Sequence, residues 1–400
     1  MSAGPDGRCE IAVIGGGIAG SALAALLSRS GRDVLLFEKD GLPRHKLCGE
    51  FLSAESQQML QRVGCLGGVL ALGPARITQG RFFSPSGHEA VFDLNGVALG
   101  ISRWSLDETL FRHAGRSGAS AHERAKVIGI VAIAGGIRLN LEWQDGRRTV
   151  VEARLVVAAY GRRSPLDAQL GRPILEDSPS ALGLKRHHRP ADTETGRLLL
   201  RELTGGVEIH LFEDGYCGLS RVEGGLVNVC LLVEKSFLKR LAAPSWDEVC
   251  SAMRARSASL RGRLSALVPA EDGFHAVAGL GFSPKETSLG RVIFVGDAAG
   301  MIAPLCGDGQ AMALESAIHL AELIGGHPRR MDDSDIAALS KGWDEIWKSR
   351  FVKRLKRGRL LQSTLLWAPG GEAAVRLISR IPRLGSALVR ATRQSLTIGG

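Results

Sequence analysis

Several common signals are absent from this chain of 400 residues, and each absence narrows what the protein can be. The seven cysteines never form a C-x-x-C pair, which argues against a zinc site and against a dithiol oxidoreductase. Met1 to Glu10 contain no basic segment followed by an apolar one, so no signal peptide is predicted. No uninterrupted apolar stretch reaches membrane-spanning length. These absences favour a cytoplasmic protein with free thiols and no metal.

The composition is that of a globular protein with a full hydrophobic core, because 44% of the residues are hydrophobic and 23% are charged. The formal net charge is +10, and it is unevenly placed. Residues 341–400 hold thirteen Lys and Arg against three Asp and Glu. The remaining 38 basic and 38 acidic residues balance, so the whole excess lies in the C-terminal segment.

A glycine-rich turn follows the apolar run 11–14 and reads G-x-G-x-x-G at Gly15, Gly17 and Gly20, with Ala19 inside it. The first glycine allows a tight turn, the second lets a pyrophosphate approach, and the third lets a helix pack on the strand. A helix is predicted from 21 to 30, with its N-terminal N–H groups facing the phosphates.

A second strand, 34–37, ends at Glu38, about 20 residues after the glycine turn, where a carboxylate binds a ribose hydroxyl in dinucleotide-binding domains. A tight turn without a ligand is the alternative interpretation of the glycines alone. Because strand, turn, helix and carboxylate occur in register, the sequence predicts that this segment binds a dinucleotide.

A second glycine-rich turn follows the apolar run 292–294 and carries Asp297. A carboxylate there can accept hydrogen bonds from the ribityl hydroxyls of FAD, and the next helix would direct its positive end at the flavin. The alternative is an ordinary turn with Asp297 as a helix cap. The two turns together favour one long cofactor, noncovalently bound FAD. The segment after Asp297 contains Pro304 and Gly307, and the next helix is predicted to begin near Gly309.

Two further segments read RWSLD at 103–107 and AAYGRRS at 158–164. With the two turns, they resemble the FAD-dependent oxidoreductases of the aromatic-hydroxylase fold. That group includes group A flavin monooxygenases, flavin halogenases and geranylgeranyl reductases. The resemblance implies that Arg103 contacts FAD and that 158–164 forms the family's third motif. The halogenase signature W-x-W-x-I-P is absent, which disfavours halogenation.

Tyr160 stands where the third motif of the family has an aspartate, which is linked there to handling of pyrophosphate and NAD(P)H. We therefore expect slow direct reduction by NAD(P)H, and a partner flavin reductase is the other possible electron source. No second G-x-G-x-x-G exists for a separate nicotinamide domain.

The segment R-H-K-L-C-G-E at 44–50 resembles the K-x-C-G stretch of geranylgeranyl reductases, which lies near the flavin. Arg44 and Lys46 are predicted to reach phosphate. Cys48 either approaches the flavin ring or is a small buried thiol, and the second interpretation is slightly favoured. No catalytic residue is assigned from the sequence.

The predicted fold is α/β, with a discontinuous Rossmann-like FAD-binding domain at 1–178 and 281–330. An antiparallel substrate domain is predicted at 179–280, and basic helices at 331–400. Glycine-containing turns separate the β-like runs of the substrate domain, and these runs are 197–203, 207–212, 216–222 and 226–233.

Isolated residues give weaker signals. His187 and His188 lie among basic residues before a proline and are predicted to form a solvated loop. His210 and Tyr216 can each face a pocket. In the basic tail, one helical face is apolar and either docks on the protein, which is favoured, or lies on an anionic membrane. This face contains Trp343, Ile346, Trp347, Phe351 and Leu355.

The favoured function is monooxygenation of a small, electron-rich substrate of secondary metabolism, through a flavin C4a-hydroperoxide. A reductase of isoprenoid C=C bonds is the runner-up. A flavin-bound module that binds a membrane or a partner without turnover is the alternative from another class. Beyond charge, no motif for nucleic acid is present.

Overall fold

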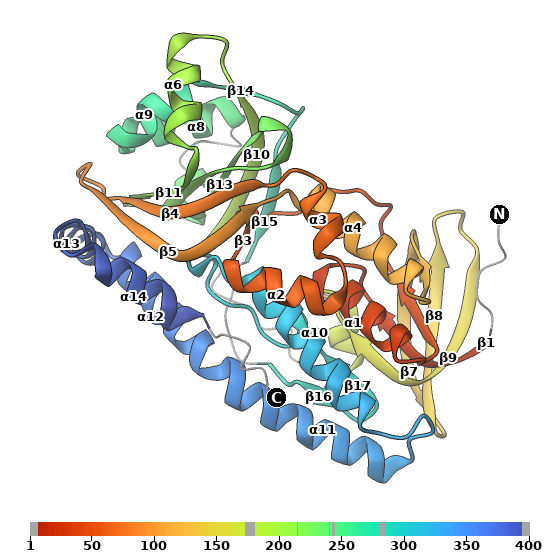
Figure 1. The fold of residues 1–400 in the computed structure, drawn as a ribbon. Helices are drawn as coiled ribbons and strands as arrows, with labels where there is room; N and C mark the ends of the chain where they lie inside the picture. The colour runs from red at the N-terminus through yellow and green to blue at the C-terminus, as the bar shows by residue number, and fades with distance from the viewer. Residues whose placement is uncertain are drawn as a thin grey trace.

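The computed structural model describes residues 7–172, 181–213, 215–239, 241, 245–279 and 285–393. Two sheets and a set of C-terminal helices make up the architecture (Figure 1). The predicted domain boundaries at 178/179 and 280/281 fall outside the described residues. The α-helices are α1 (Ile18–Arg29), α2 (Ala54–Val63), α3 (Leu66–Leu70), α4 (Arg103–Arg116), α5 (Pro165–Gln169), α6 (Glu194–Glu202), α7 (Lys235–Lys239), α8 (Trp246–Arg256), α9 (Ala258–Ser265), α10 (Gly309–Gly325), α11 (Asp333–Trp347), α12 (Lys353–Leu366), α13 (Ala368–Arg380) and α14 (Pro382–Thr392).

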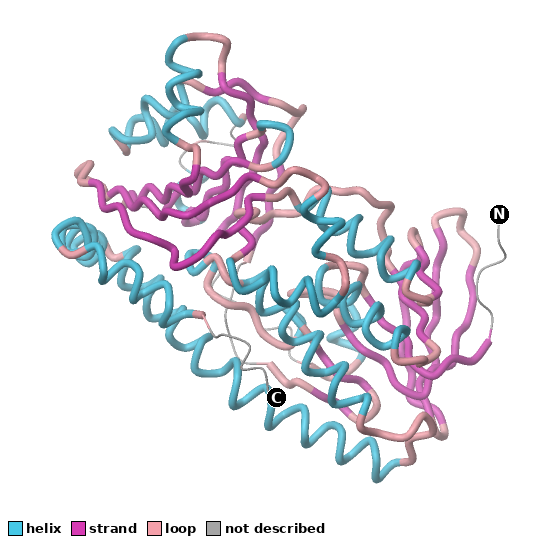
Figure 2. The backbone as a smooth tube through the Cα atoms, viewed as in Figure 1, coloured by secondary structure: helices cyan, strands magenta, loops and turns pink. Residues whose placement is uncertain are grey.

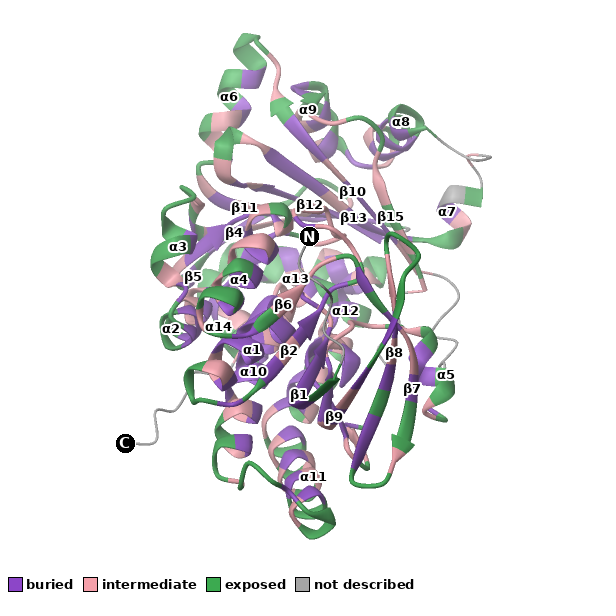
Figure 3. Cartoon of the chain, turned by 90° about the vertical axis from the view of Figure 1, so that its right-hand side faces the viewer, coloured by how far each residue is buried: buried purple, intermediate pink, exposed green. Residues whose placement is uncertain are grey.

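The first sheet has the order β16-β17-β9-β1-β2-β6, and its central pairs are parallel. β8 and β7 extend it from β9 as antiparallel strands. Residues 11–14 of β1 are buried, as expected for a parallel strand covered on both faces (Figure 3). β1 and β17 both run parallel to β9, so the glycine turns that follow them lie at the same, carboxyl-terminal ends of the strands. Its strands are β1 (Gly7–Ile14), β2 (Val34–Phe37), β6 (Ser120–His122), β7 (Ala125–Ile133), β8 (Gly136–Trp143), β9 (Arg148–Ala158), β16 (Ser288–Leu289) and β17 (Val292–Phe294).

The second sheet has the order β14-β10-β13-β12-β11-β4-β5-β3, and β15 also pairs with β10. The predicted hairpins at 207–233 are confirmed as the antiparallel run β11-β12-β13. The sheet also takes β3, β4 and β5 from 51–100, a segment assigned from sequence to the FAD-binding domain. Its strands are β3 (Phe51–Leu52), β4 (Ala75–Phe83), β5 (Glu89–Gly100), β10 (Ala181–Pro190), β11 (Gly205–Phe212), β12 (Gly215–Arg221), β13 (Val227–Glu234), β14 (Leu267–Pro269) and β15 (His275–Ala278).

One predicted strand of the second domain is wrong, because 197–203 lies largely in helix α6. Thr193 caps this helix by accepting a hydrogen bond from the Gly196 N–H at 3.1 Å. Leu199 and Leu203, four residues apart, are buried on one side against the sheet. The cap and the helical spacing of these leucines outweigh the β-like composition.

The C-terminal helices run along the body of the protein, and α11 passes through a π-helical segment at 348–352 into α12 (Figure 2). Trp343, Trp347 and Phe351 are buried in the core of the first sheet, and the Trp343 indole N–H donates to the Phe294 carbonyl at 3.0 Å. The apolar face of the basic tail therefore docks on the protein. Among the described residues, no helix is both long and apolar enough to cross a membrane.

Candidate functional site

The first glycine turn is as closely packed as its sequence predicts. Gly15 has a φ of +110°, and a Cβ on it would lie 2.4 Å from the Ala159 carbonyl oxygen. A Cβ on Gly20 would lie 1.9 Å from the Gly15 carbonyl oxygen. Only glycine fits at either position. The third motif thus lies directly against the first, because Ile14 of β1 pairs with Ala158 of β9.

Two cations face this turn at Gly17. A Cβ there would lie 3.1 Å from Lys46 Nζ and 3.8 Å from Arg103 Nη2. The carboxylate of Asp107 accepts from Arg103 at 2.7 and 2.8 Å and from Lys46 at 2.9 Å. Burial acts to raise the pKa of Asp107, but the two cations hold it well below its usual range. Sequence reasoning missed Asp107, although its spacing of four residues from Arg103 was visible.

Glu38 lies beside the same glycine turn. Its carboxylate accepts from the Gly16 N–H at 2.9 Å and from Arg44 at 2.9 Å, and it is 2% exposed. The predicted ribose-binding residue therefore lies beside the predicted phosphate-binding glycines. The carboxylate of Glu38 and the cationic side chains of Arg44, Lys46 and Arg103 lie around this turn. One carboxylate and three cations fit the adenosine pyrophosphate half of FAD.

The second glycine turn lies against the first. Gly296 has a φ of +58°, and a Cβ on it would lie 3.0 Å from the Ala19 Cβ. Asp297 follows in the same turn. Burial raises the pKa of its carboxyl, while Arg103 acts in the opposite direction. Because Gly296 packs against Ala19, the predicted ribityl and pyrophosphate contacts lie next to each other.

The second motif ends at the beginning of α10. Pro304 begins a short 3₁₀ turn, and Gly307 has a φ of +63°, so the chain reverses before the helix. Gly309 is the first residue of α10, as predicted. A Cβ on Gly307 would lie 3.2 Å from the Phe51 ring, so the motif contacts the second sheet. The positive end of α10 is thus directed at the boundary between the two sheets.

Cys48 lies at this boundary. Its sulfur accepts from the Glu50 N–H at 3.4 Å and from the Gln310 side-chain amide at 3.2 Å. Asn228 of β13 donates to the Cys48 carbonyl at 3.0 Å. Gln310 Oε1 and Asn228 Oδ1 are buried and have no hydrogen-bond partner among the described residues. Unpaired buried oxygens next to a helix N-terminus fit a ring that carries N–H donors, as the flavin does.

Glu50 is the centre of a buried ionic cluster behind Cys48. It has a φ of +56°, unusual for a residue with a side chain. Its carboxylate pairs with Lys185, accepts from the Arg103 N–H at 2.9 Å, and lies 2.6 Å from His187 Nε2. Burial acts to raise the pKa of Glu50, but His187 and Lys185 lower it. Nothing in the sequence pattern pointed to this cluster.

The prediction of a solvated loop at His187 and His188 is wrong, because both residues lie within β10 and are 2% and 3% exposed. The strand is flanked by β13 on one side and by β14 and β15 on the other. His188 Nε2 accepts from the Trp246 indole at 3.1 Å. The neighbouring basic residues led to the prediction of a solvent-exposed loop. However, Lys185 is itself fully buried, and its charge is neutralised by pairing with Glu50.

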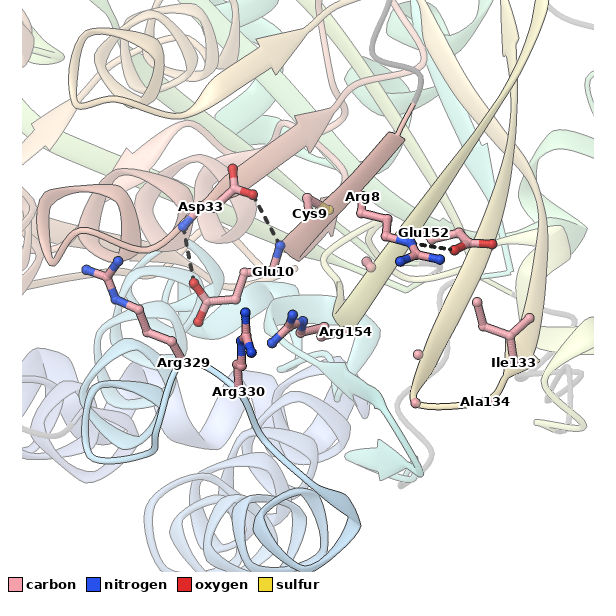
Figure 4. Close-up of a pocket in the computed structure, with 13 residues that line it drawn as sticks. Arg8, Cys9, Glu10, Asp33, Ile133, Ala134, Glu152, Arg154, Arg329 and Arg330 are labelled. Atoms are coloured by element: carbon pink, nitrogen blue, oxygen red, sulfur yellow. Dashed lines mark hydrogen bonds and ion pairs between the residues drawn. The ribbon is translucent and has the colours of Figure 1, made fainter.

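A surface hollow of about 430 Å³ lies elsewhere, near the start of β1 (Figure 4). Arginines and acids line it, and Arg8 pairs with Glu152 there at 3.2 Å. Ligands of parallel sheets bind at the carboxyl ends of the strands. This hollow is at the opposite ends, so it is separate from the glycine turns. Its charged lining residues are Arg8, Glu10, Asp33, Glu152, Arg154, Arg329 and Arg330.

Solved flavoproteins share this fold over nearly the whole chain. A flavin-dependent brominase matches with a TM-score of 0.78 at 17% identity, covering 96% of this chain and 93% of its own. A geranylgeranyl bacteriochlorophyll reductase-like protein from Thermoplasma acidophilum gives 0.74 at 18%, with 98% and 97% covered. An FAD binding domain family model matches residues 8–188. Residues 8–188 therefore match an FAD binding domain, and the chain is similar over most of its length to FAD-dependent oxidoreductases and shares their fold.

Curated relatives of this oxidoreductase have more than one reaction type. A menaquinone reductase from Mycobacterium tuberculosis is 28% identical over 373 residues, which are 88% of this chain and 82% of the relative. A kynurenine 3-monooxygenase from Xanthomonas campestris is 26% identical over 345 residues, which are 82% and 74%. The oxidoreductase is therefore similar both to a reductase and to a monooxygenase.

Proposed function

We propose that this oxidoreductase uses FAD to reduce a carbon–carbon double bond in an apolar, prenyl-bearing substrate. The observation that carries the proposal is the position of Cys48, on the K-x-C-G segment, between the N-terminus of α10 and the second sheet. Similarity to the menaquinone reductase and to the geranylgeranyl reductase-like structure supports it. The sequence alone favours monooxygenation, so the preference changes here.

Each part of the site has a role in this reaction. Bound FAD supplies the hydride when reduced. Lys46, Arg103 and Glu38 would hold its adenosine pyrophosphate, and Asp297 its ribityl chain. A proton must also reach the second carbon of the double bond, and in this proposal the Cys48 thiol delivers it and regains a proton from water. Near Cys48, next to the ionic cluster of Glu50, the second sheet also offers an apolar wall. Its side chains include Phe51, Tyr216 and Leu232.

Monooxygenation is the second candidate, and similarity to the kynurenine 3-monooxygenase supports it. The same apolar wall would keep water from the reacting atoms, which both reactions need. The electron source is part of both proposals: NAD(P)H directly, or a partner flavin reductase.

Product analysis tests the proposal. Reduced holoenzyme would be mixed without oxygen with a prenylated quinone, and the product analysed by mass spectrometry. We expect a gain of two hydrogens on the prenyl chain, slowed by Cys48→Ser and unchanged by Cys65→Ser, a matched buried thiol outside the site. In a parallel reaction under ¹⁸O₂, incorporation of ¹⁸O with no saturation would instead support monooxygenation. FAD binding without either product would contradict both and favour a module without turnover.

A further inference from the structure

Three side chains from separate segments of the chain converge beside Glu50: His45, His187 of β10, and Glu271. Each offers one ligand atom, and these atoms lie within 4.8 Å of one another. His45 Nε2 is 3.0 Å from Glu271 Oε2, and His187 Nδ1 is 3.5 Å from Glu271 Oε1. Ligands about 2.0–2.1 Å from a tetrahedral metal ion lie about 3.4 Å apart. The two separations from Glu271 are close to this value, and 4.8 Å bounds the separation between the two imidazoles.

His187 has the support that metal-binding imidazoles usually have. Its Nε2 lies 2.6 Å from Glu50 Oε2, and because a carboxylate only accepts, the Nε2–H donates to it. Its Nδ1 lies 3.5 Å from Glu271 Oε1 and is the atom that a bound ion would share with this carboxylate. A carboxylate on the second ring nitrogen fixes the tautomer and orientation of metal-binding histidines. The Glu50 carboxylate is held in turn by Lys185 and by the Arg103 N–H.

The charge and exposure of this cluster also suit a cation. Two carboxylates, Glu50 and Glu271, face one permanent cation, Lys185, and the other titratable groups that face Glu271 are the imidazoles of His45, His187 and His275. The His187 side chain is 3% exposed, whereas those of Glu271 and His45 are 18% and 22% exposed. The cluster is therefore closed on one side and reaches solvent on the other, which gives an ion a path of entry. The His45 Nδ1 atom is buried and has no hydrogen-bond partner among the described residues.

We propose that His45, His187 and Glu271 bind one divalent transition-metal ion, with water in the remaining position. Two imidazoles and a carboxylate suit zinc or ferrous iron rather than magnesium or calcium. The ion would join the loop that carries Lys46 and Cys48 to β10 of the second sheet. The proposal does not depend on which reaction the flavin performs. Sequence analysis predicted no metal because these ligands lie far apart in the chain and form no spacing pattern.

Zinc titration of the full-length holoenzyme tests the proposal, with any affinity tag removed and the protein first treated with a chelator. We expect one equivalent of zinc to bind in isothermal titration calorimetry, and elemental analysis to give the same ratio. His45→Ala and Glu271→Gln should each weaken binding by tenfold or more. The matched control His88→Ala removes a half-exposed histidine elsewhere and should leave it unchanged. Glu50→Gln should weaken binding by about 10- to 100-fold, as loss of an outer carboxylate does.

Two results would overturn the proposal: no stoichiometric zinc binding by the wild type, or unchanged binding by both His45→Ala and Glu271→Gln. Circular dichroism and the flavin absorbance of each variant establish that it is folded. Because His45 and Glu271 reach the site from different segments, one variant remains informative if the other does not fold.

Discussion

At the scale of single residues, Tyr160 departs most clearly from the motifs of the family. Its hydroxyl donates to Asp167 at 2.6 Å, and Asp167 is paired with Arg172 at 2.7 Å. Burial and the hydrogen bond to Asp167 raise the pKa of Tyr160 well above its usual range. The side chain is a neutral donor directed at Asp167. It therefore places no negative charge where the family has an aspartate.

We predict slow reduction of the flavin by NADPH or NADH alone. Anaerobic stopped-flow measurement of flavin bleaching tests this without knowledge of the substrate. Tyr160→Asp should accelerate bleaching, whereas Tyr160→Phe should not. Bleaching of the wild type at ordinary turnover rates, about 10 s⁻¹, would contradict the prediction.

Asp297→Ala should weaken FAD binding more than Cys48→Ala does. The first change removes charge-assisted hydrogen bonds to the ribityl hydroxyls, worth about 1.5–3 kcal/mol, or roughly ten- to hundredfold in affinity. Cys48 would only lie beside the ring. Fluorescence titration of the two apoproteins measures both affinities, and equal values would remove Asp297 from the site.

The lowered pKa of Glu208 predicts how the free energy of unfolding depends on pH. Burial acts to raise its pKa, but hydrogen bonds from His210 and Arg263 lower it to about 2. Its ordinary value is 4.5, so its stabilising effect is complete above that pH and is lost as the pH falls towards 2. The advantage of the wild type over Glu208→Gln in urea unfolding should fall by about 1 kcal/mol between pH 7 and roughly pH 3.5. A constant difference would contradict this assignment, and Glu202→Gln on the same Arg263 is the control.

At the scale of elements, the C-terminal helices are joined to the cofactor-binding half by one buried cation. Arg354 of α12 pairs with Asp308, directly before α10, and with Glu315 inside it. Arg354 is 4% exposed. Burial raises the pKa of Asp308 to about 6, and Arg354 acts in the opposite direction. The position of α10 therefore depends on a helix about forty residues further along the chain.

Arg354→Met should lower the free energy of unfolding by about 3–5 kcal/mol, because two buried carboxylates lose their cation. Arg357→Met, at an exposed arginine three residues away, should change it by less than about 0.5 kcal/mol. Urea unfolding of the FAD-loaded proteins provides the comparison. Similar losses in both variants would mean that the buried cluster does not join these elements.

The C-terminal helices also predict that the protein contacts a membrane surface. Large apolar side chains are exposed there among arginines and lysines, which suits an anionic lipid surface. We expect the protein to sediment with vesicles containing phosphatidylserine, and the double variant Leu360→Ala, Leu377→Ala to do so less. Leu198→Ala, at an exposed leucine of α6, is the control, and equal losses would contradict the prediction. The exposed residues are Leu360, Trp367, Leu377 and Ile381.

At the scale of the whole molecule, what could be predicted from sequence is what is encoded locally. Both glycine turns, Glu38 and the start of α10 follow from neighbouring residues, and the structure has them where predicted. The pairing of β11 with β4 joins 205–212 to 75–83, and no local pattern carries it. The Glu50 cluster depends on this arrangement, since His187 and Lys185 reach it from β10. The buried histidines were missed for the same reason, whereas Asp107 was missed although it pairs with Arg103 only four residues away.

The cofactor-binding edge combines β1, near the amino terminus, with β17, near residue 294. During synthesis, the ribosome must therefore produce every residue from Gly17 to Asp297 before the two turns can meet. A nascent chain that ends before residue 290 has the first glycine turn but lacks the second glycine turn and α10. Stable capture of the flavin is thus a late event of biosynthesis. When the vitamin from which FAD is made is scarce, the released polypeptide would contain both glycine turns but no bound flavin.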